Sequence, residues 1–315
     1  MIDVIVTRKT LEAEGILSFE LTRADDGVLM PFSAGSHIDV HLPSGQIRQY
    51  SLCNHPSELH RYQIGVLLDP ASRGGSKAMH ALVEGSRLQI SEPRNLFALA
   101  HGGRRSLLFA GGIGITPILC MAERLAQIDA DFQLHYCGRS RSQVAFVERI
   151  QHSIFSDHAH LHFDDQPDTQ LNAAQALASY AEGDHLYVCG PAGFMEFILS
   201  EARNAGWPAD SLHREYFAVQ PLTQMNEGSF EVVLASSGRC LHVPADRSVA
   251  EVLLESGIDL PLSCEQGICG TCLTRVLEGE PDHRDMFMTP AEQAANDQFT
   301  PCCSRSKSPR LVLDL

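Results

Sequence analysis

The sequence has little positive charge, with 24 Lys and Arg residues against 39 Asp and Glu residues and a net charge of −15. Nucleic acids and anionic membranes attract basic surfaces, so this balance predicts neither as a partner. No basic leader precedes an apolar run, and the uncharged stretch from Ser106 to Ala122 is shorter than the roughly 18 residues of a membrane helix. The ten cysteines lack the regular framework of a small secreted domain. These absences predict a cytoplasmic protein, which we expect to be a monomer.

Three segments differ in their hydrophobic pattern, and 315 residues suffice for two or three domains of about 100 to 150 residues. Residues 1–102 contain short alternating runs separated by turns, which is typical of an antiparallel barrel. Residues 103–220 alternate strands with helices, which indicates a parallel α/β sheet. After a polar linker at residues 221–228, residues 229–315 predict a small mixed sheet with one helix. The predicted fold is therefore multidomain, α/β plus β.

The periodicity also predicts individual elements. In the first segment we expect strands at residues 2–7, 16–22, 37–42, 62–68 and 87–91. In the second we expect strands at 106–110, 132–137, 160–163 and 185–189, and helices at 116–128, 144–152, 171–181 and 192–205. In the third we expect strands at 230–234, 240–243, 273–277 and 311–315, and a helix at 249–255 capped by Ser248.

The cysteines near the C-terminus carry the most specific signal. Cys264, Cys269 and Cys272 have the spacing C-x4-C-x2-C, and Cys302 and Cys303 follow at a distance. This spacing is typical of plant-type [2Fe-2S] sites, in which four thiolates hold two irons. The interval from Cys272 to Cys302 matches such sites, so we expect Cys302 to be the fourth ligand. A structural zinc site, which usually has paired C-x2-C knuckles, and buried structural thiols are the alternatives.

Two motifs in the first segment are suited to a phosphate and an aromatic ring. Arg48, Tyr50 and Ser51 lie on an expected exposed strand and offer a guanidinium, a flat ring and a hydroxyl. The turn of Ser72, Arg73, Gly74, Gly75 and Ser76 opens a short helix, where free amides suit a phosphate. Together the motifs fit flavin mononucleotide (FMN), whereas a solvated strand face and a plain loop are the alternatives.

Two motifs in the second segment lie at expected strand ends, where α/β sheets bind their ligands. Gly112 and Gly114 match the opening of G-x-G-x-x-G, but Pro117 stands in place of the third glycine and Thr116 is a good N-cap. Cys189, Gly190 and Pro191 end a later strand in the same way. Cys189 would approach a nicotinamide or be a buried structural residue.

Charged residues after two of these strands bear on the choice of nucleotide. Arg139 would meet a ribose or adenine phosphate, or be a surface arginine. Asp164 and Asp165 would repel a 2′-phosphate, whereas Arg139 and Arg141 would attract one. The residues alone leave the choice between NADH and NADPH open.

The order of these motifs along the whole chain resembles the phthalate dioxygenase reductase family, and within it the reductase components of vanillate O-demethylases. The resemblance implies an FMN-binding barrel, a ferredoxin-reductase-type NADH domain and a C-terminal β-grasp ferredoxin domain. It implies electron transfer from NADH through FMN and a [2Fe-2S] cluster to a separate, transiently bound Rieske-type oxygenase. The oxygenase would act on an aromatic acid such as vanillate or phthalate.

The resemblance also implies roles for individual residues. The FMN contacts would be Arg48, Tyr50, Ser51, Val66, Gly74, Gly75, Ser76, Thr116 and Phe217. The NADH path would be lined by Gly112, Gly114, Arg139, Cys189, Gly190 and Pro191. We expect Ser51 to donate a hydrogen bond near the reacting flavin atom, and Ser51 and Cys189 are the predicted catalytic residues. A stand-alone NAD(P)H-dependent ferredoxin or quinone reductase and a non-enzymatic iron-sulfur sensor are the competing functions.

Overall fold

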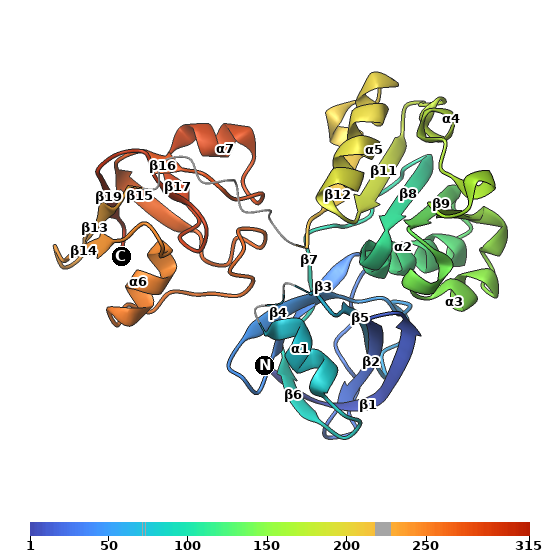
Figure 1. The fold of residues 1–315 in the computed structure, drawn as a ribbon, viewed down its shortest axis with the longest axis horizontal. Coiled ribbons are helices and arrows are strands. Elements are labelled where there is room, and N and C mark those ends of the chain that lie inside the picture. The colour runs from blue at the N-terminus through green and yellow to red at the C-terminus, as the bar shows by residue number, and fades with distance from the viewer. Residues whose placement is uncertain (71, 73, 218–227) are drawn as a thin grey trace. The chain divides into compact units, whose positions relative to one another are not determined.

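The computed structural model describes residues 1–70, 72, 74–217 and 228–315. Arg73 of the expected glycine turn and all but the last residue of the expected linker at 221–228 lie outside the described residues. The chain forms two compact units, Met1–Glu215 and Tyr216–Leu315 (Figure 1). No helix among the described residues is long and apolar enough to cross a membrane.

The first sheet of the first unit is antiparallel and has seven strands, in the order β4-β3-β6-β1-β2-β5, with β7 paired to β3. Its strands are β1 (Ile2–Ala13), β2 (Ile16–Arg23), β3 (Ser36–His41), β4 (Ile47–Ser51), β5 (Tyr62–Leu67), β6 (Arg87–Ile90) and β7 (Arg94–Asn95), and the helix α1 (Gly75–Ala81) follows β5. Alternate residues of β1, such as Val4 and Val6, are fully buried because successive side chains of a strand point to opposite faces.

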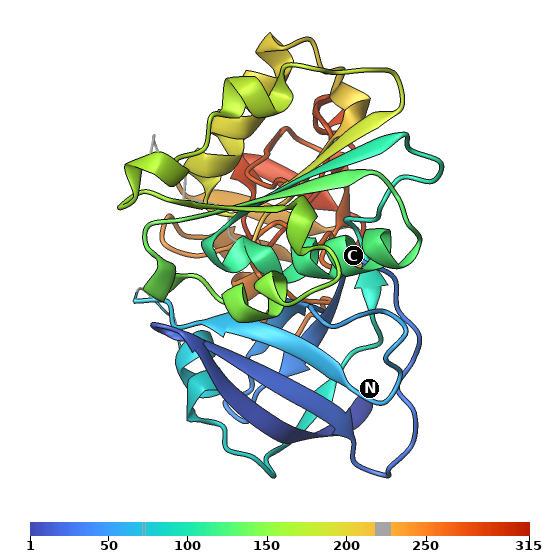
Figure 2. The same cartoon turned by 90° about the vertical axis from the view of Figure 1, so that its right-hand side faces the viewer.

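The second sheet of this unit is parallel, in the order β10-β9-β8-β11-β12. Its elements are β8 (Arg105–Gly111), α2 (Ile115–Gln127), β9 (Phe132–Gly138), α3 (Val147–Gln151), β10 (Ala159–Phe163), α4 (Ala173–Leu177), β11 (Asp184–Cys189), α5 (Ala192–Asn204) and β12 (Leu212–Glu215). The helices α2 and α5 lie on opposite faces of the sheet (Figures 1 and 2).

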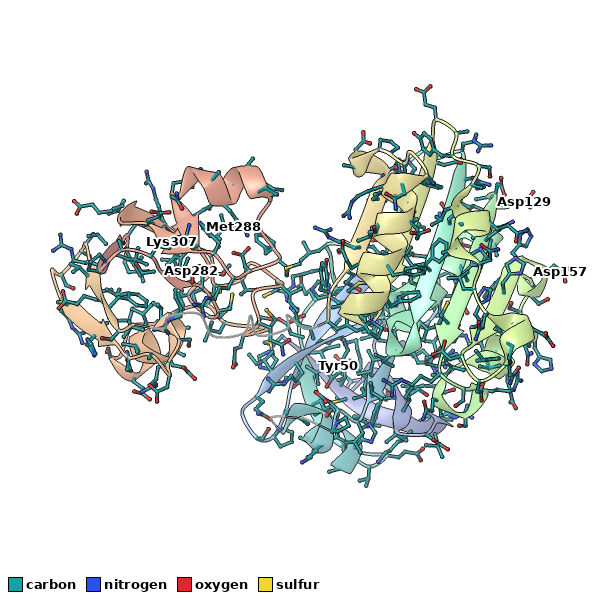
Figure 3. All side chains as sticks on the ribbon, turned by 45° about the horizontal axis from the view of Figure 1, so that its top comes forward. Tyr50, Asp129, Asp157, Asp282, Met288 and Lys307 are labelled. Atoms are coloured by element: carbon teal, nitrogen blue, oxygen red, sulfur yellow. The ribbon has the colours of Figure 1, made fainter. Side chains whose placement is uncertain are left out.

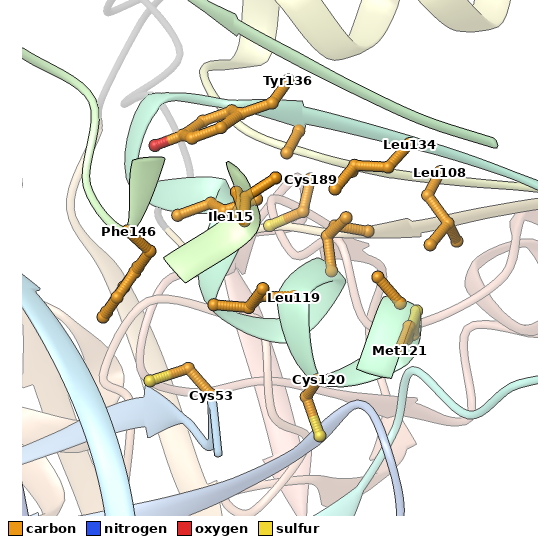
Figure 4. Packing of buried hydrophobic residues seen from close by; sticks show 14 of the residues in the cluster. Cys53, Leu108, Ile115, Leu119, Cys120, Met121, Leu134, Tyr136, Phe146 and Cys189 are labelled. Carbon is orange, nitrogen blue, oxygen red and sulfur yellow. The ribbon is translucent and has the colours of Figure 1, made fainter. Parts of the chain in front are cut away.

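One hydrophobic core joins the parallel sheet to the barrel. Leu108, Leu134 and Tyr136 of the sheet lie on one side of α2, and Cys53 of the barrel segment belongs to the same buried cluster (Figure 4). Arg149 of α3 adds polar contacts, because its guanidinium donates to Gln63 of β5 at 2.7 Å and to Glu123 of α2 at 2.6 Å. Apolar and polar contacts therefore hold both sheets in one unit.

The second unit contains a five-stranded mixed sheet, in the order β14-β13-β19-β15-β17, and a small β16-β18 pair. Its elements are β13 (Phe230–Leu234), β14 (Cys240–Val243), α6 (Val249–Glu255), β15 (Thr274–Glu278), β16 (Pro281–Asp282), α7 (Pro290–Ala295), β17 (Gln298–Phe299), β18 (Arg305–Ser306) and β19 (Arg310–Leu313). Ser248 accepts a hydrogen bond from the Glu251 amide in a capping box, which fixes the start of α6.

The predicted bounds of β13, β14 and α6 agree with the structure, while others need correction. The helix expected at 171–181 is shortened to α4, and the one expected at 144–152 to α3 after a 3₁₀ turn. The helix α2 begins at Ile115, because a 3₁₀ turn at Gly112–Gly114 runs directly into it, so Thr116 is not its N-cap. The strand β12 and the helix α7 were not predicted.

Candidate functional site

Ser51 ends β4 and is 4% exposed, and its Oγ donates to Oε2 of Glu215 at 3.1 Å. The prediction of an exposed strand here is wrong, since Arg48 and Tyr50 are partly buried as well. Tyr50, labelled in Figure 3, packs against the barrel core, and burial raises the pKa of its hydroxyl well above the ordinary value. The strand end thus presents Ser51 toward the parallel sheet.

Glu215 is the last residue of β12 and the register partner of Cys189 on β11. Burial raises the pKa of the Glu215 carboxyl to about 8, and the hydrogen bond from Ser51 opposes this shift. The Cys189 thiol is fully buried, and burial followed by the nearby Glu215 carboxylate raises its pKa well above the usual value. The structure therefore brings Ser51, Glu215 and Cys189 together, with the thiol held neutral.

The two glycine motifs of the parallel sheet pack backbone to backbone. A Cβ at Gly114 would overlap the carbonyl of Cys189, and a Cβ at Gly190 would lie 2.9 Å from Cα of Gly111. Gly112 has φ of 52°, a left-handed conformation that favours glycine. Pro191 is the N-cap of α5, so the motif at 189–191 also opens a helix. The two motifs predicted to line the NADH path thus meet at the carboxyl ends of β8 and β11.

Thr116 and Val66 connect this surface to the barrel. Thr116 is 2% exposed, and its Cγ2 would lie 2.8 Å from a Cβ at Gly65, the neighbour of Val66 on β5. Val66 is buried, and its carbonyl oxygen contacts Nε2 of His80 at 3.0 Å. The structure therefore places Thr116 against the strand that carries Val66.

The glycine turn lies against Arg48. Gly74 caps α1 with φ of 105°, and a Cβ at Gly75 would overlap the Arg48 side chain. The amide of Gly74 donates to Ser72 Oγ at 3.1 Å, and Ser76 Oγ accepts from the Asp69 amide at 3.2 Å. The structure thus places the predicted phosphate-binding guanidinium beside the predicted phosphate-binding turn.

Arg139 and the acidic pair lie at the ends of adjacent strands. The amide of Asp164 donates to the Gly138 carbonyl at 3.0 Å, and the amide of Asp165 to the Arg139 carbonyl at 3.2 Å. All three charged side chains are exposed. Phe217, which is 39% exposed, belongs to the second unit, and its predicted contact with the flavin stays a prediction.

The four predicted ligand thiols lie in two pairs, Cys264 with Cys269 and Cys272 with Cys302, each joined by a side-chain hydrogen bond. Backbone amides point at the sulfurs: that of Gln266 lies 3.4 Å from Cys264 Sγ, and that of Thr271 lies 3.5 Å from Cys269 Sγ. Each iron of a [2Fe-2S] cluster is held by two thiolates, so each of the two pairs supplies the ligands of one iron. Among the described residues, no three His, Cys, Asp or Glu side chains are arranged to hold a single metal ion.

Cys303 faces a different set of neighbours. Its Sγ lies 3.2 Å from Thr300 Oγ1, and a Cβ at Gly267 would overlap it. Cys302 shares a side-chain hydrogen bond with Cys303 as well as with Cys272. The choice of Cys302 as the fourth ligand stays a prediction, which rests on its interval from Cys272 in the sequence.

Comparison with known protein sequences adds two similarities. Residues 232–307 match the sequence model of a 2Fe-2S iron-sulfur cluster binding domain. The chain is 62% identical over 317 residues to the vanillate O-demethylase oxidoreductase of Pseudomonas putida, covering 100% of both chains. The chain belongs to the vanillate O-demethylase oxidoreductase family.

Solved structures agree with this membership. The chain superposes on phthalate dioxygenase reductase with a TM-score of 0.80 at 36% identity, covering 99% of this chain and 97% of that one. That protein has a modular structure for electron transfer from pyridine nucleotides to [2Fe-2S]. An intact type IV self-sufficient cytochrome P450 monooxygenase superposes with a TM-score of 0.83 at 36% identity, over 100% of this chain and 41% of that one. The predicted family, fold class, reductase function and cofactors are confirmed.

The sequence interpretation missed Glu215 as a functional residue. The only signal was its acidic side chain next to Tyr216 at the end of the second segment. Its importance comes from its contact with Ser51, and the strand β12 that carries it was not predicted.

Proposed function

We propose that this reductase takes electrons from NADH and passes them through FMN and its [2Fe-2S] cluster to a separate Rieske-type oxygenase that demethylates an aromatic acid such as vanillate. The observation that carries the proposal is the 62% identity to a vanillate O-demethylase oxidoreductase over the whole of both chains. FMN accepts a hydride from NADH and releases electrons singly, as a [2Fe-2S] cluster takes them. We assign residues 1–102 to FMN, 103–220 to NADH and 229–315 to the cluster.

The residues around β4 fit FMN. Arg48 beside the Gly74–Gly75 turn supplies a cation for a phosphate, and a side chain at Gly75 would displace that guanidinium. Tyr50 and Ser51 supply a ring and a hydroxyl, with Val66, Ser76, Thr116 and Phe217 as further contacts. The NADH path runs along Gly112, Gly114, Gly190 and Pro191 to Cys189, with Arg139 at the adenosine end.

Within this site, Glu215 controls the proton of Ser51. With a pKa of about 8, the Glu215 carboxyl is mostly protonated near neutral pH. A protonated carboxyl donates to Ser51 Oγ and leaves the serine hydrogen free to donate to the bound cofactor. An ionised carboxylate instead accepts that hydrogen, as the 3.1 Å bond allows. Ser51 is therefore the donor to the cofactor, and Glu215 sets when it donates.

Cys264, Cys269, Cys272 and Cys302 would hold the cluster, whose potential is near about −400 mV in plant-type proteins. That is low enough to reduce a Rieske centre, whose potential is about −150 mV or higher. The relative with P450 monooxygenase activity carries a region of this fold in the same chain, which supports an oxygenase as the acceptor. We propose a cytoplasmic monomer that meets its oxygenase transiently, with no nucleic-acid or membrane partner.

The test is an absorption spectrum of the purified protein before and after anaerobic NADH, followed by turnover with a purified vanillate-type oxygenase. We expect flavin and iron-sulfur bands that NADH bleaches, and demethylation that requires both proteins. A protein without flavin or cluster would contradict the proposal. Bleaching without oxygenase turnover, together with rapid reduction of free quinone or ferredoxin, would instead identify a stand-alone reductase. Cluster bands that NADH leaves unchanged would identify a redox sensor.

A further inference from the structure

His37 lies directly across from Ser51 in the β3–β4 ladder. In this ladder the amide of Leu52 donates to the carbonyl of Ser36 at 2.8 Å, so Ser36 and Leu52 form a hydrogen-bonded pair. Hydrogen-bonded and non-hydrogen-bonded pairs alternate along antiparallel strands, which makes His37 and Ser51 a non-hydrogen-bonded pair. The side chains of such a pair lie closest to each other, on the same face of the sheet.

The next pair on this face shows how close these side chains come. Asp39 and Gln49 are register partners two residues along, and Gln49 Nε2 donates to Asp39 Oδ1 at 2.9 Å. On the other side of β3, Arg94 of β7 is the register partner of His37, and its guanidinium donates to Asp39 at 2.7 Å. His37 therefore stands between Arg94 and Ser51 in a polar row on one face of the barrel.

Among the described residues of this row, His37 presents a buried ring nitrogen without a hydrogen-bond partner, as Arg94 does with its Nε. His37 is 5% exposed, and its Nε2 has no hydrogen-bond partner among the described residues. Asp39 is bonded to Gln49 and Arg94, and Ser51 is bonded to Glu215. A buried polar atom without a partner costs free energy, so such atoms are usually satisfied by water or by a ligand.

The imidazole of His37 is suited to a neutral ligand. Burial, together with the charge of Arg94, lowers the pKa of His37 to about 4, against a smaller opposing effect of Asp39. A neutral imidazole can donate or accept through Nε2, depending on its tautomer. The ring of a flavin carries both donors and acceptors along its polar edge.

The geometry points to His37 as a further flavin-binding residue, whose Nε2 hydrogen-bonds the polar edge of the flavin ring beside Ser51. This inference rests on the proposed function, because it takes FMN to lie at Ser51. It gives the buried imidazole the partner that the described residues do not supply, and it extends the flavin site from β4 onto β3.

The test compares FMN affinity in the full-length holoprotein, from the rise in free-flavin fluorescence on dilution. His37→Leu removes the polar nitrogen, His37→Gln keeps a polar atom, and His41→Leu is the matched control on the same face of β3. We expect the FMN Kd to rise about tenfold in His37→Leu, as loss of one hydrogen bond predicts, and to change less than about threefold in the other two. If His37→Leu fails to fold, His37→Met, with its unbranched side chain, takes its place.

A second readout is the reduction potential of the bound flavin, which depends on hydrogen bonds to the ring. We expect a shift in the apolar His37 variant and none in His41→Leu. Unchanged FMN Kd and potential in the apolar His37 variant would overturn the inference and leave the proposed function intact. A wild-type protein that binds no FMN would overturn the proposed function instead.

Discussion

Ser51 and Glu215 are 164 positions apart in the sequence, yet Ser51 Oγ donates to Glu215 Oε2 across 3.1 Å. The serine ends an antiparallel strand of the barrel and the glutamate ends an edge strand of the parallel sheet. The contact therefore joins the proposed FMN segment to the proposed NADH segment at the point where a hydride would pass between their ligands. The protonation state of the Glu215 carboxyl should therefore control the rate at which NADH reduces the flavin.

The first prediction concerns the pH dependence of flavin reduction by NADH in single-turnover stopped-flow experiments. Because the pKa of Glu215 is raised to about 8, the wild-type rate should fall as pH rises through about 8, when the carboxylate captures the Ser51 hydrogen. Glu215→Gln carries an amide that donates at every pH, so its rate should stay level across this range. Ser51→Ala should be slower throughout, by roughly tenfold to a hundredfold. If the rate in Glu215→Gln fell with pH as it does in the wild type, a group other than Glu215 would control flavin reduction.

The second prediction uses two glycines of the NADH segment. Gly114→Ala would press a methyl group into the Cys189 carbonyl, whereas Gly193, in α5, has no atom within 4 Å of its added Cβ. We expect Gly114→Ala to lose about 1–3 kcal/mol of stability and to raise the KM for NADH, because the strand end and the helix start are forced apart. Gly193→Ala should keep or raise the Tm, since alanine favours helix over glycine. Equal Tm values for the two variants would mean that the Gly114 turn tolerates a side chain.

Local signals explain why part of the fold was predictable. The helix α6 was predicted with its observed bounds because Ser248 is a typical N-cap and Gly257 is a typical helix stop. The ligand cysteines were predictable for the same reason, since three of them lie within nine consecutive residues. In both cases the residues that form the feature are neighbours in the sequence, so a short stretch is enough to reveal it.

Contacts between distant segments explain what was missed. The strand β12 reads Leu-His-Arg-Glu, which has neither alternation nor β-branched residues, and it forms only because β11 offers an edge to pair with. Glu215 was missed along with it. His37 looked like an ordinary residue of an alternating strand, because its burial without a partner depends on the packing around β3.

The third prediction separates the two adjacent cysteines. Cys302→Ala should abolish the normal cluster, because Cys302 is the thiol bonded to Cys272. Cys303→Ala, the matched control, should keep iron and sulfide at two each per chain, the stoichiometry of a [2Fe-2S] cluster. Iron analysis and electron paramagnetic resonance of the reduced protein measure the cluster content of both variants. A normal spectrum in Cys302→Ala, with loss in Cys303→Ala, would make Cys303 the ligand.

The fourth prediction concerns the choice of nucleotide. Asp164 and Asp165 are exposed at the strand ends beside Arg139, where their charge would repel a 2′-phosphate. We expect kcat/KM to favour NADH, and the preference to fall roughly tenfold, or about 1.4 kcal/mol, in a variant with both residues replaced by serine. Asp168→Ser, an exposed acidic residue on the following turn, is the control and should leave the ratio unchanged. A wild-type preference for NADPH would assign Arg139 and Arg141 to the phosphate instead.

The fifth prediction concerns acid stability and the histidines of β9 and β10. His135 is 7% exposed, stacks on Phe109 with ring centroids 4.9 Å apart, and has its Nδ1 3.0 Å from Nε2 of His162. Burial, with smaller effects of His162 and His160, lowers the pKa of His135 to about 3. The folded protein therefore keeps His135 neutral at pH values where the unfolded chain, with a pKa near about 6.5, takes up a proton.

Stability linked to His135 is fully present above about pH 6.5 and is lost as pH falls toward 3, by up to about 1.4 kcal/mol per pH unit. The Tm of the wild type should fall between about pH 7 and pH 5, and the fall should be smaller in His135→Gln, which cannot be protonated in this range. His60→Gln replaces an exposed histidine and should behave as the wild type. If His135→Gln lost as much Tm as the wild type on acidification, the source of the acid sensitivity would be a group other than His135.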